Sequence, residues 1–190
     1  MSEPFLITGL PRSRTAWFAA VASNDRSICY HEPLSRLYRW EDIFSVVWCH
    51  QQAEYVGISD HGLGFWLAEI MDRLAPRTLI IERPMEEVKA SLTRIGVTQT
   101  NMCELLLEKL AVVHPRVMRV PYAALESVET VTRCLRHLMP TVNVNASRIR
   151  ELQRLNIQAD VKTTLADAQS RVRAVDHFVP RDVLARLEVA

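Results

Sequence analysis

The order of short apolar runs and longer helical patterns constrains the fold of this chain more than any other feature. The apolar runs predict five strands, at 4–8, 27–30, 55–58, 78–81 and 117–120. Helical patterns occupy 15–22, 37–50, 63–74, 85–95, 102–113, 126–138 and 147–155, and a helical tail is predicted at 163–187. Runs such as LIT and TLII are apolar on both faces, which is typical of a parallel sheet covered by helices on both sides. We therefore predict an α/β, three-layer fold of the P-loop type, with a parallel sheet of about five strands and a helical C-terminal part, in a single domain spanning 1–190.

Polar residues follow each predicted strand. In an open parallel sheet the carboxyl ends of the strands meet at one edge, where ligands bind. We expect five polar clusters at this edge: residues 9–14, then His31, Glu32 and Pro33, then Ser59, Asp60 and His61, then Glu82 and Arg83, and last Pro121 and Tyr122. Asp60 is interpreted as a cap for the helix that follows. The alternative is that Asp60 and His61 line the acceptor pocket.

The first loop, in GLPRSRTAWF, predicts an anion site. A strand, a glycine and a tight loop direct the unpaired backbone N–H groups of a helix start at an anion. Ser13 and Thr15 add hydroxyl donors, while Arg12 and Arg14 add charge and forked hydrogen bonds. The alternative is a simple turn in which Ser13 or Thr15 caps the helix.

The same loop differs from the P-loop of nucleotide triphosphatases, G-x-x-x-x-G-K-[ST]. Aligned from Gly9, the chain has Arg14 in place of the second glycine and Thr15 in place of the lysine. Ala16 stands where that motif has the hydroxyl that binds magnesium. The loop-to-helix geometry is kept, but the residues for ATP-Mg hydrolysis are missing.

A second anion site is indicated by the stretch TLIIERPMEEVKASL. The fourth strand ends at Arg83, and Pro84 is well placed at the start of the next helix. Ser91 lies about two turns into that helix, at 3.6 residues per turn. The turn can fold Arg83 back, so that Arg83 and Ser91 flank one ligand.

These stretches resemble the sulfotransferase family, most closely its short bacterial and phage members. PRSRTAWF resembles the loop, roughly P-[KR]-S-G-[ST]-T-W, that cradles the 5′-phosphosulfate of 3′-phosphoadenosine 5′-phosphosulfate. IIERPMEEVKASL resembles the motif whose Arg and Ser hold the 3′-phosphate, and RVPYAAL resembles a later strand followed by Tyr-x-x-Leu. The resemblance covers about 4–139. It implies a sulfotransferase that moves a sulfuryl group from this donor to an acceptor hydroxyl of a small molecule or a carbohydrate, without a metal.

The resemblance also implies roles for individual residues. Arg12, Ser13 and Thr15 match the phosphosulfate loop, in which Arg14 replaces the usual glycine and Ala16 a frequent hydroxyl residue. Arg83 and Ser91 match the 3′-phosphate pair. The glycine-rich loop that closes over the nucleotide in many cytosolic members has no counterpart, because no glycine follows Gly96.

Two residues after the second strand are candidates for the general base. Glu32 ranks first, because a Glu near this place has a similar role in many bacterial and Golgi-type members, and His31 ranks second. An ion pair between Glu32 and Arg36 or Arg14 is the structural alternative.

Two other functions are compatible with the same motifs. One is a P-loop kinase of nucleotides or small molecules, against which Thr15 and Ala16 argue. The other is a non-catalytic nucleotide-binding module that has kept the sulfotransferase fold. Arg14 and the absence of the closing loop favour this alternative.

Charge and cysteine usage narrow the class of partners. The formal net charge of +1 gives no bulk polycation, so we expect neither nucleic acid nor a membrane as a partner. Four widely spaced cysteines without a CxxC pair predict neither a disulfide framework nor a zinc site. The N-terminus lacks the features of a signal peptide, and we expect a cytoplasmic protein.

Overall fold

Five parallel strands form one sheet in the computed structural model, which describes residues 2–35, 39–48, 53–98 and 100–155. The strands are β1 (Glu3–Gly9), β2 (Ser27–His31), β3 (Tyr55–Ser59), β4 (Arg77–Glu82) and β5 (Val117–Pro121). Their order is β2-β3-β1-β4-β5, and every neighbouring pair is parallel. β1 lies at the centre, where the chain switches from one side of the sheet to the other. The predicted α/β fold with a five-stranded parallel sheet is confirmed.

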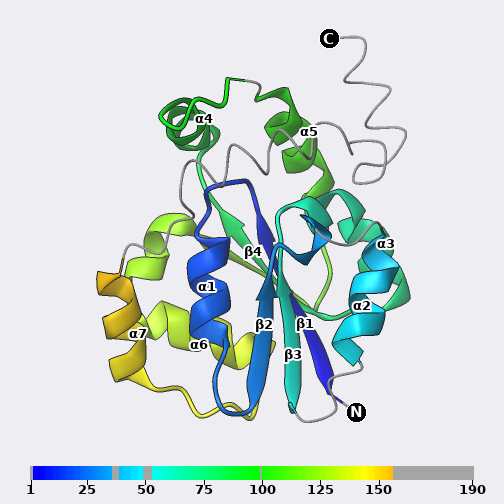
Figure 1. Cartoon of the computed structure of the whole chain (residues 1–190), viewed down its shortest axis with the longest axis vertical. Coiled ribbons are helices and arrows are strands. Elements are labelled where there is room, and N and C mark those ends of the chain that lie inside the picture. The colour runs from blue at the N-terminus through cyan, green and yellow to red at the C-terminus, as the bar shows by residue number, and fades with distance from the viewer. Residues whose placement is uncertain (1, 36–38, 49–52, 99, 156–190) are drawn as a thin grey trace.

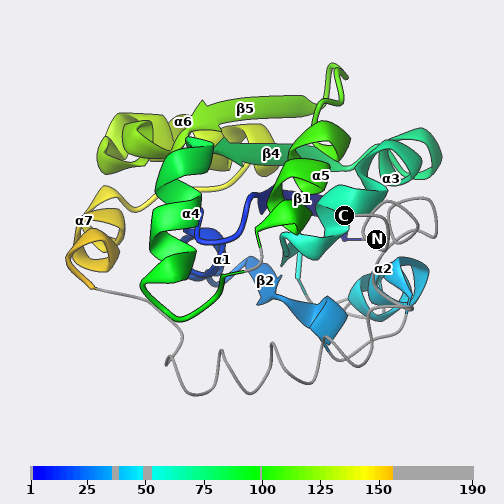
Figure 2. The same ribbon diagram turned by 90° about the horizontal axis from the view of Figure 1, so that it is seen from above.

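Helices cover both faces of this sheet (Figures 1 and 2). One face carries α1 (Thr15–Ala22), α6 (Val128–Leu138) and α7 (Ala146–Arg154). The other carries α2 (Trp40–Trp48), α3 (Leu67–Arg73) and α5 (Asn101–Lys109). The remaining helix, α4 (Met85–Thr93), lies above the carboxyl edge of the strands in Figure 1. Three short 3₁₀ helices follow strand ends: η1 (Pro33–Ser35), η2 (Gly62–Trp66) and η3 (Tyr122–Glu126).

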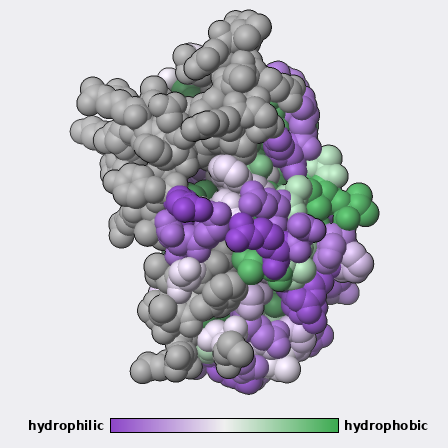
Figure 3. All heavy atoms as spheres, turned by 90° about the vertical axis from the view of Figure 1, so that its right-hand side faces the viewer, coloured by the Kyte–Doolittle hydropathy of each residue, from purple (hydrophilic) through white to green (hydrophobic). Residues whose placement is uncertain are grey.

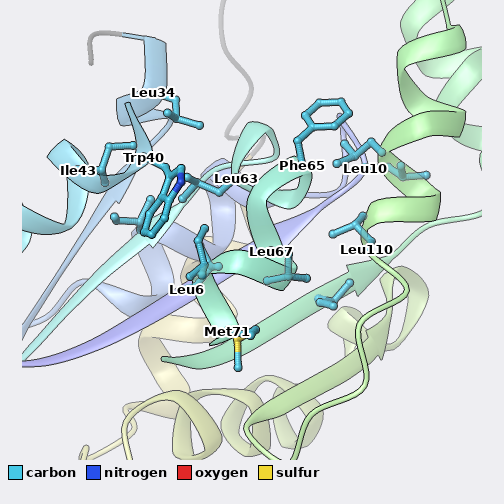
Figure 4. Packing of buried hydrophobic residues seen from close by; sticks show 14 of the residues in the cluster. Leu6, Leu10, Leu34, Trp40, Ile43, Leu63, Phe65, Leu67, Met71 and Leu110 are labelled. Atoms are coloured by element: carbon cyan, nitrogen blue, oxygen red, sulfur yellow. The ribbon is translucent and has the colours of Figure 1, made fainter. Parts of the chain in front are cut away.

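The alternation of side chains along β1 divides the core in two. Leu6 is fully buried on the side of α2, α3 and α5, whereas Phe5 and Ile7 are fully buried on the side of α1, α6 and α7. Figure 4 shows the first cluster, in which Leu6 lies among side chains from η2, α3 and the neighbouring helices. A strand buried on both faces is held in a fixed position, so the loop that leaves it is fixed as well.

Gly9 ends β1 where two backbones approach closely. A Cβ built on Gly9 would lie 2.5 Å from the carbonyl oxygen of Ile81 in β4. Any larger residue would push these strands apart exactly where the loop to α1 begins, because a backbone carbonyl cannot move aside as a flexible side chain can.

One predicted helix ends earlier than its pattern indicated. The apolar pattern predicted a helix to 113, but α5 ends at Lys109. Pro115 disfavours helical geometry in the preceding residue, and Arg119 donates to the carbonyls of Leu110 and Val112, which would otherwise lack partners at a helix end.

Two other helices begin differently from the prediction. The stretch 63–74 starts as the 3₁₀ helix η2 before it becomes α3. The helix predicted from 126 begins at Val128, because Ser127 is its N-cap and its side chain accepts from the backbone N–H of Thr130. The predicted tail helix at 163–187 lies outside the described residues, so the single domain over 1–190 stays a prediction.

Hydrophilic side chains cover much of the described part of the face in Figure 3, with separate hydrophobic areas between them. Within the described ranges, no helix combines the length and the apolar character that crossing a membrane requires.

Candidate anion-binding site at the sheet edge

The loop between β1 and α1 has an unusual backbone. Arg12 and Arg14 have φ angles of 66° and 60°, in the left-handed region that non-glycine residues rarely occupy. Such strain persists where the surrounding structure enforces it, and it gathers at functional sites. Left-handed residues in a tight loop turn successive N–H groups toward one concavity, which is a known way to bind an anion. The loop leads directly into the first turn of α1, whose N–H groups point the same way.

Ser13 lies between these two arginines and is fully buried. Its Oγ has no hydrogen-bond partner among the described residues. Buried hydroxyls nearly always have a partner, because an unpaired one costs free energy. This hydroxyl is therefore the strongest single sign that the loop is built to meet a polar ligand.

Thr15 and Ala16 form the start of α1. Thr15 is buried, and its Oγ1 lies 3.5 Å from Nε2 of His31 at the end of β2. Ala16 is half-buried and offers a ligand only its backbone N–H. Ser59 fixes this helix start from β3, because its Oγ donates to the carbonyl of Thr15 at 2.8 Å.

Two contacts join the motif of Arg83 and Ser91 to this loop. Nη1 of Arg83 donates to the carbonyl oxygen of Arg12 at 2.5 Å, and Nε of Arg12 donates to Oγ of Ser91 at 3.3 Å. The side chain of Arg83 is 13% exposed, and its Nε also lies 3.3 Å from Oε2 of Glu87. The structure thus brings Arg12, Arg83 and Ser91 together at the exits of two adjacent strands.

The side chain of Arg14 contacts η3. Its Nη2 pairs with Oε1 of Glu126 at 2.5 Å, and its Cζ lies 5.0 Å from the ring centre of Tyr122. Cζ of Arg83 lies 4.3 Å from the same ring, so both guanidinium groups contact Tyr122 by cation–π interactions. The sequence pointed to Tyr122 through its place after the fifth strand and through the family segment, and nothing in the sequence pointed to Glu126.

The candidate base Glu32 lies beside two histidines. It has a left-handed φ of 47°, and its N–H donates to the carbonyl of Ser59 at 2.9 Å. Its Oε1 lies 3.1 Å from Nδ1 of His61 and 3.8 Å from Nε2 of His31. Of the two arginines considered as alternative partners, Arg14 pairs with Glu126, and Arg36 lies outside the described residues. The sequence placed Glu32 and His61 at the same edge of the sheet but did not predict their direct contact.

Asp60 has a structural role at this edge. Its buried carboxylate accepts from the backbone N–H of Leu34 in η1 at 3.1 Å and from that of Gly62 in η2 at 2.8 Å. The carboxylate thus accepts from one early N–H of each short helix, although His61 rather than Asp60 occupies the N-cap position of η2. Burial is the main cause of the raised pKa of Asp60, and the nearby charge of Glu32 raises it further, while His61 acts in the opposite direction.

Comparison with known proteins adds no family assignment: the chain matches no family model and no curated protein. The part of the chain that the structure describes contains no group of three or more His, Cys, Asp or Glu side chains that could hold a metal ion. The predicted independence from metals stays a prediction.

Proposed function

We propose that the chain is a sulfotransferase that moves a sulfuryl group from 3′-phosphoadenosine 5′-phosphosulfate to an acceptor hydroxyl of a carbohydrate or another small molecule. The observation that carries this proposal is the contact between the two motifs. Arg83 and Ser91 meet the loop through Arg12, so two anion-binding groups flank one site. A nucleoside with phosphate groups at both ends fits such a pair.

The loop fits the 5′-phosphosulfate end of this donor. The buried Oγ of Ser13 supplies a hydroxyl that needs a partner, and the helix start supplies N–H groups. The guanidinium of Arg12 adds charge at the same place. The side chain of Arg14 is held by Glu126 and Tyr122. The replacement of the family's glycine is therefore compatible with a bound anion.

Arg83 and Ser91 fit the 3′-phosphate. Arg83 has its Nε against Glu87 and its Nη1 against the loop carbonyl, which holds the guanidinium plane in place. A guanidinium held in this way can make a forked pair of hydrogen bonds to phosphate oxygens. Ser91 is buried and can donate its hydroxyl proton to the same group.

The donor supplies an activated sulfuryl group; the chain supplies a base and charge stabilisation. Glu32 accepts the proton of the acceptor hydroxyl as its oxygen bonds to sulfur. The bond from sulfur to the 5′-phosphate oxygen breaks, and the electron pair stays on that oxygen. Arg12 and the loop N–H groups stabilise the negative charge that develops there. His31 lies between Thr15 and Glu32 and is the second candidate for the base.

Transfer of labelled sulfate to a panel of sugars and phenols tests this proposal. We expect product with at least one acceptor, without added metal, and a loss of about 10²- to 10⁴-fold in Glu32→Gln, as is typical of a lost general base. Turnover of ATP that depends on magnesium would instead identify a kinase. Binding of the bisphosphorylated product nucleotide without any transfer would identify a non-catalytic module.

A further inference from the structure

We propose that His61 is a positioning residue that orients the carboxylate of Glu32, an inference that rests on the proposed function. Oε1 of Glu32 lies 3.1 Å from Nδ1 of His61, the shortest contact recorded for this carboxylate with either histidine. The two residues come from different strand ends. Neither motif of the donor site includes His61, and its role follows from geometry alone.

Strand pairing creates this contact. β2 and β3 are parallel and pair His31 with Ser59, so Glu32 and Asp60 leave the sheet side by side, and His61 follows. The backbone of Glu32 is held by its hydrogen bond to the carbonyl of Ser59 and by its left-handed φ. These features fix the backbone of Glu32 and leave the direction of its carboxylate to side-chain contacts.

The chemistry of the Glu32–His61 pair determines which ring nitrogen of His61 carries the hydrogen. An ionised carboxylate can only accept hydrogen bonds, so Nδ1 of His61 carries the hydrogen and donates it to Oε1. A neutral His61 then has its proton on Nδ1 and its lone pair on Nε2. This contact holds the carboxylate in one orientation toward the acceptor, as in other enzymes where a second side chain orients the base.

Other titratable groups surround the pair. His31 faces Glu32 from β2, with its Nε2 3.8 Å from Oε1, and it also reaches Thr15 on α1 at 3.5 Å. Asp60, which follows β3, is buried, and both of its carboxylate oxygens accept from backbone N–H groups. His31 therefore faces the anion loop, where it can add to charge stabilisation, while the contact of His61 with Glu32 serves orientation.

A first experiment tests the pair without relying on sulfuryl transfer. Nuclear magnetic resonance of the full chain follows the titration of the His61 ring in the wild type and in Glu32→Gln. Loss of the negative charge within hydrogen-bond distance should shift the His61 midpoint to lower pH by roughly one unit. His114 serves as the internal control, because it lies in a different loop, before β5, and its midpoint should stay unchanged. An unchanged His61 midpoint would overturn the pairing.

A second experiment tests the consequence for catalysis. The reaction is release of sulfate from the donor to water, which needs no identified acceptor. In His61→Ala we expect kcat to fall about tenfold or more, while the donor KM stays within about twofold. In His61→Asn most of this loss of kcat should be recovered, because the amide can donate a hydrogen bond in place of Nδ1. His114→Asn should behave as the wild type. Wild-type kcat in His61→Ala, or no recovery in His61→Asn, would contradict a positioning role.

The two experiments separate the two proposals. A wild-type protein that transfers no sulfuryl group to any acceptor of the panel, yet shows the shifted His61 midpoint, would refute the proposed function and keep the Glu32–His61 pair. A protein that releases sulfate with an unshifted midpoint and an active His61→Ala would keep the function and refute the role of His61.

Discussion

The guanidinium of Arg83 donates a hydrogen bond to the backbone carbonyl of Arg12, which joins the turn after β4 to the loop after β1. Arg12 in turn donates to Ser91 on α4. β1 and β4 are adjacent in the sheet, so their carboxyl ends, and the two motifs they carry, leave the sheet side by side. Two segments that are far apart in the sequence thus meet at one edge of the sheet.

Ser13→Ala should have opposite effects on stability and on binding. The variant removes a buried hydroxyl without a partner, so we expect the free energy of unfolding of the unliganded protein to rise by about 1 kcal/mol. Binding of adenosine 3′,5′-bisphosphate should weaken by about tenfold, because the ligand loses a donor. Urea denaturation and calorimetry measure the two quantities.

Ser59→Ala is the matched control for this prediction. Ser59 is equally buried, but its hydroxyl already donates to the carbonyl of Thr15, so its loss should lower the free energy of unfolding by about 1 kcal/mol. If both variants destabilised the protein equally, Ser13 would have a partner in the native state, and the loop would lose its strongest sign of a ligand.

Arg14→Gly and Arg14→Ala should differ in stability by about 1 kcal/mol, with glycine the more stable. Both variants lose the ion pair with Glu126, which contributes at most about 1 kcal/mol because its partners are partly exposed. Only glycine relieves the left-handed backbone at this position. Arg133, an exposed residue in the middle of α6, should show the reverse order, because glycine weakens a helix relative to alanine. The same order at both positions would contradict the left-handed geometry of Arg14.

The stability contributed by Asp60 should depend on pH. Burial raises its pKa in the folded protein above the ordinary value of 3.8, so the folded state holds this proton more tightly than the unfolded chain does. The wild type should therefore gain stability relative to Asp60→Asn as the pH falls from above the raised pKa toward 3.8. Denaturation at a series of pH values measures the difference, with the exposed Asp72→Asn as the control. A difference that is constant with pH would show that the Asp60 pKa is not raised.

The five strands could be predicted from the sequence, because their apolar runs indicate burial. The shared edge could be predicted as well, because the carboxyl ends of parallel strands lie at the same edge of a sheet. The direction of the Arg14 side chain could not be predicted from the sequence. It depends on the ion pair with Glu126, a residue distant in the sequence that η3 brings next to Arg14. The contact between Glu32 and His61 depends on the register of β2 and β3, which an apolar pattern does not specify. The early end of α5 needed the contacts of Arg119, which only the fold provides.

Calorimetry with adenosine 3′,5′-bisphosphate shows whether the two motifs bind one ligand together, because this ligand carries a phosphate for each half of the proposed site. We predict binding of one molecule per chain, weakened by about 10- to 100-fold in Arg83→Ala, where a charged hydrogen-bond donor is lost. Arg136→Ala, which removes an exposed arginine of α6 outside the site, should bind as the wild type does. Absence of binding, or equal affinity in the wild type and Arg83→Ala, would contradict the account.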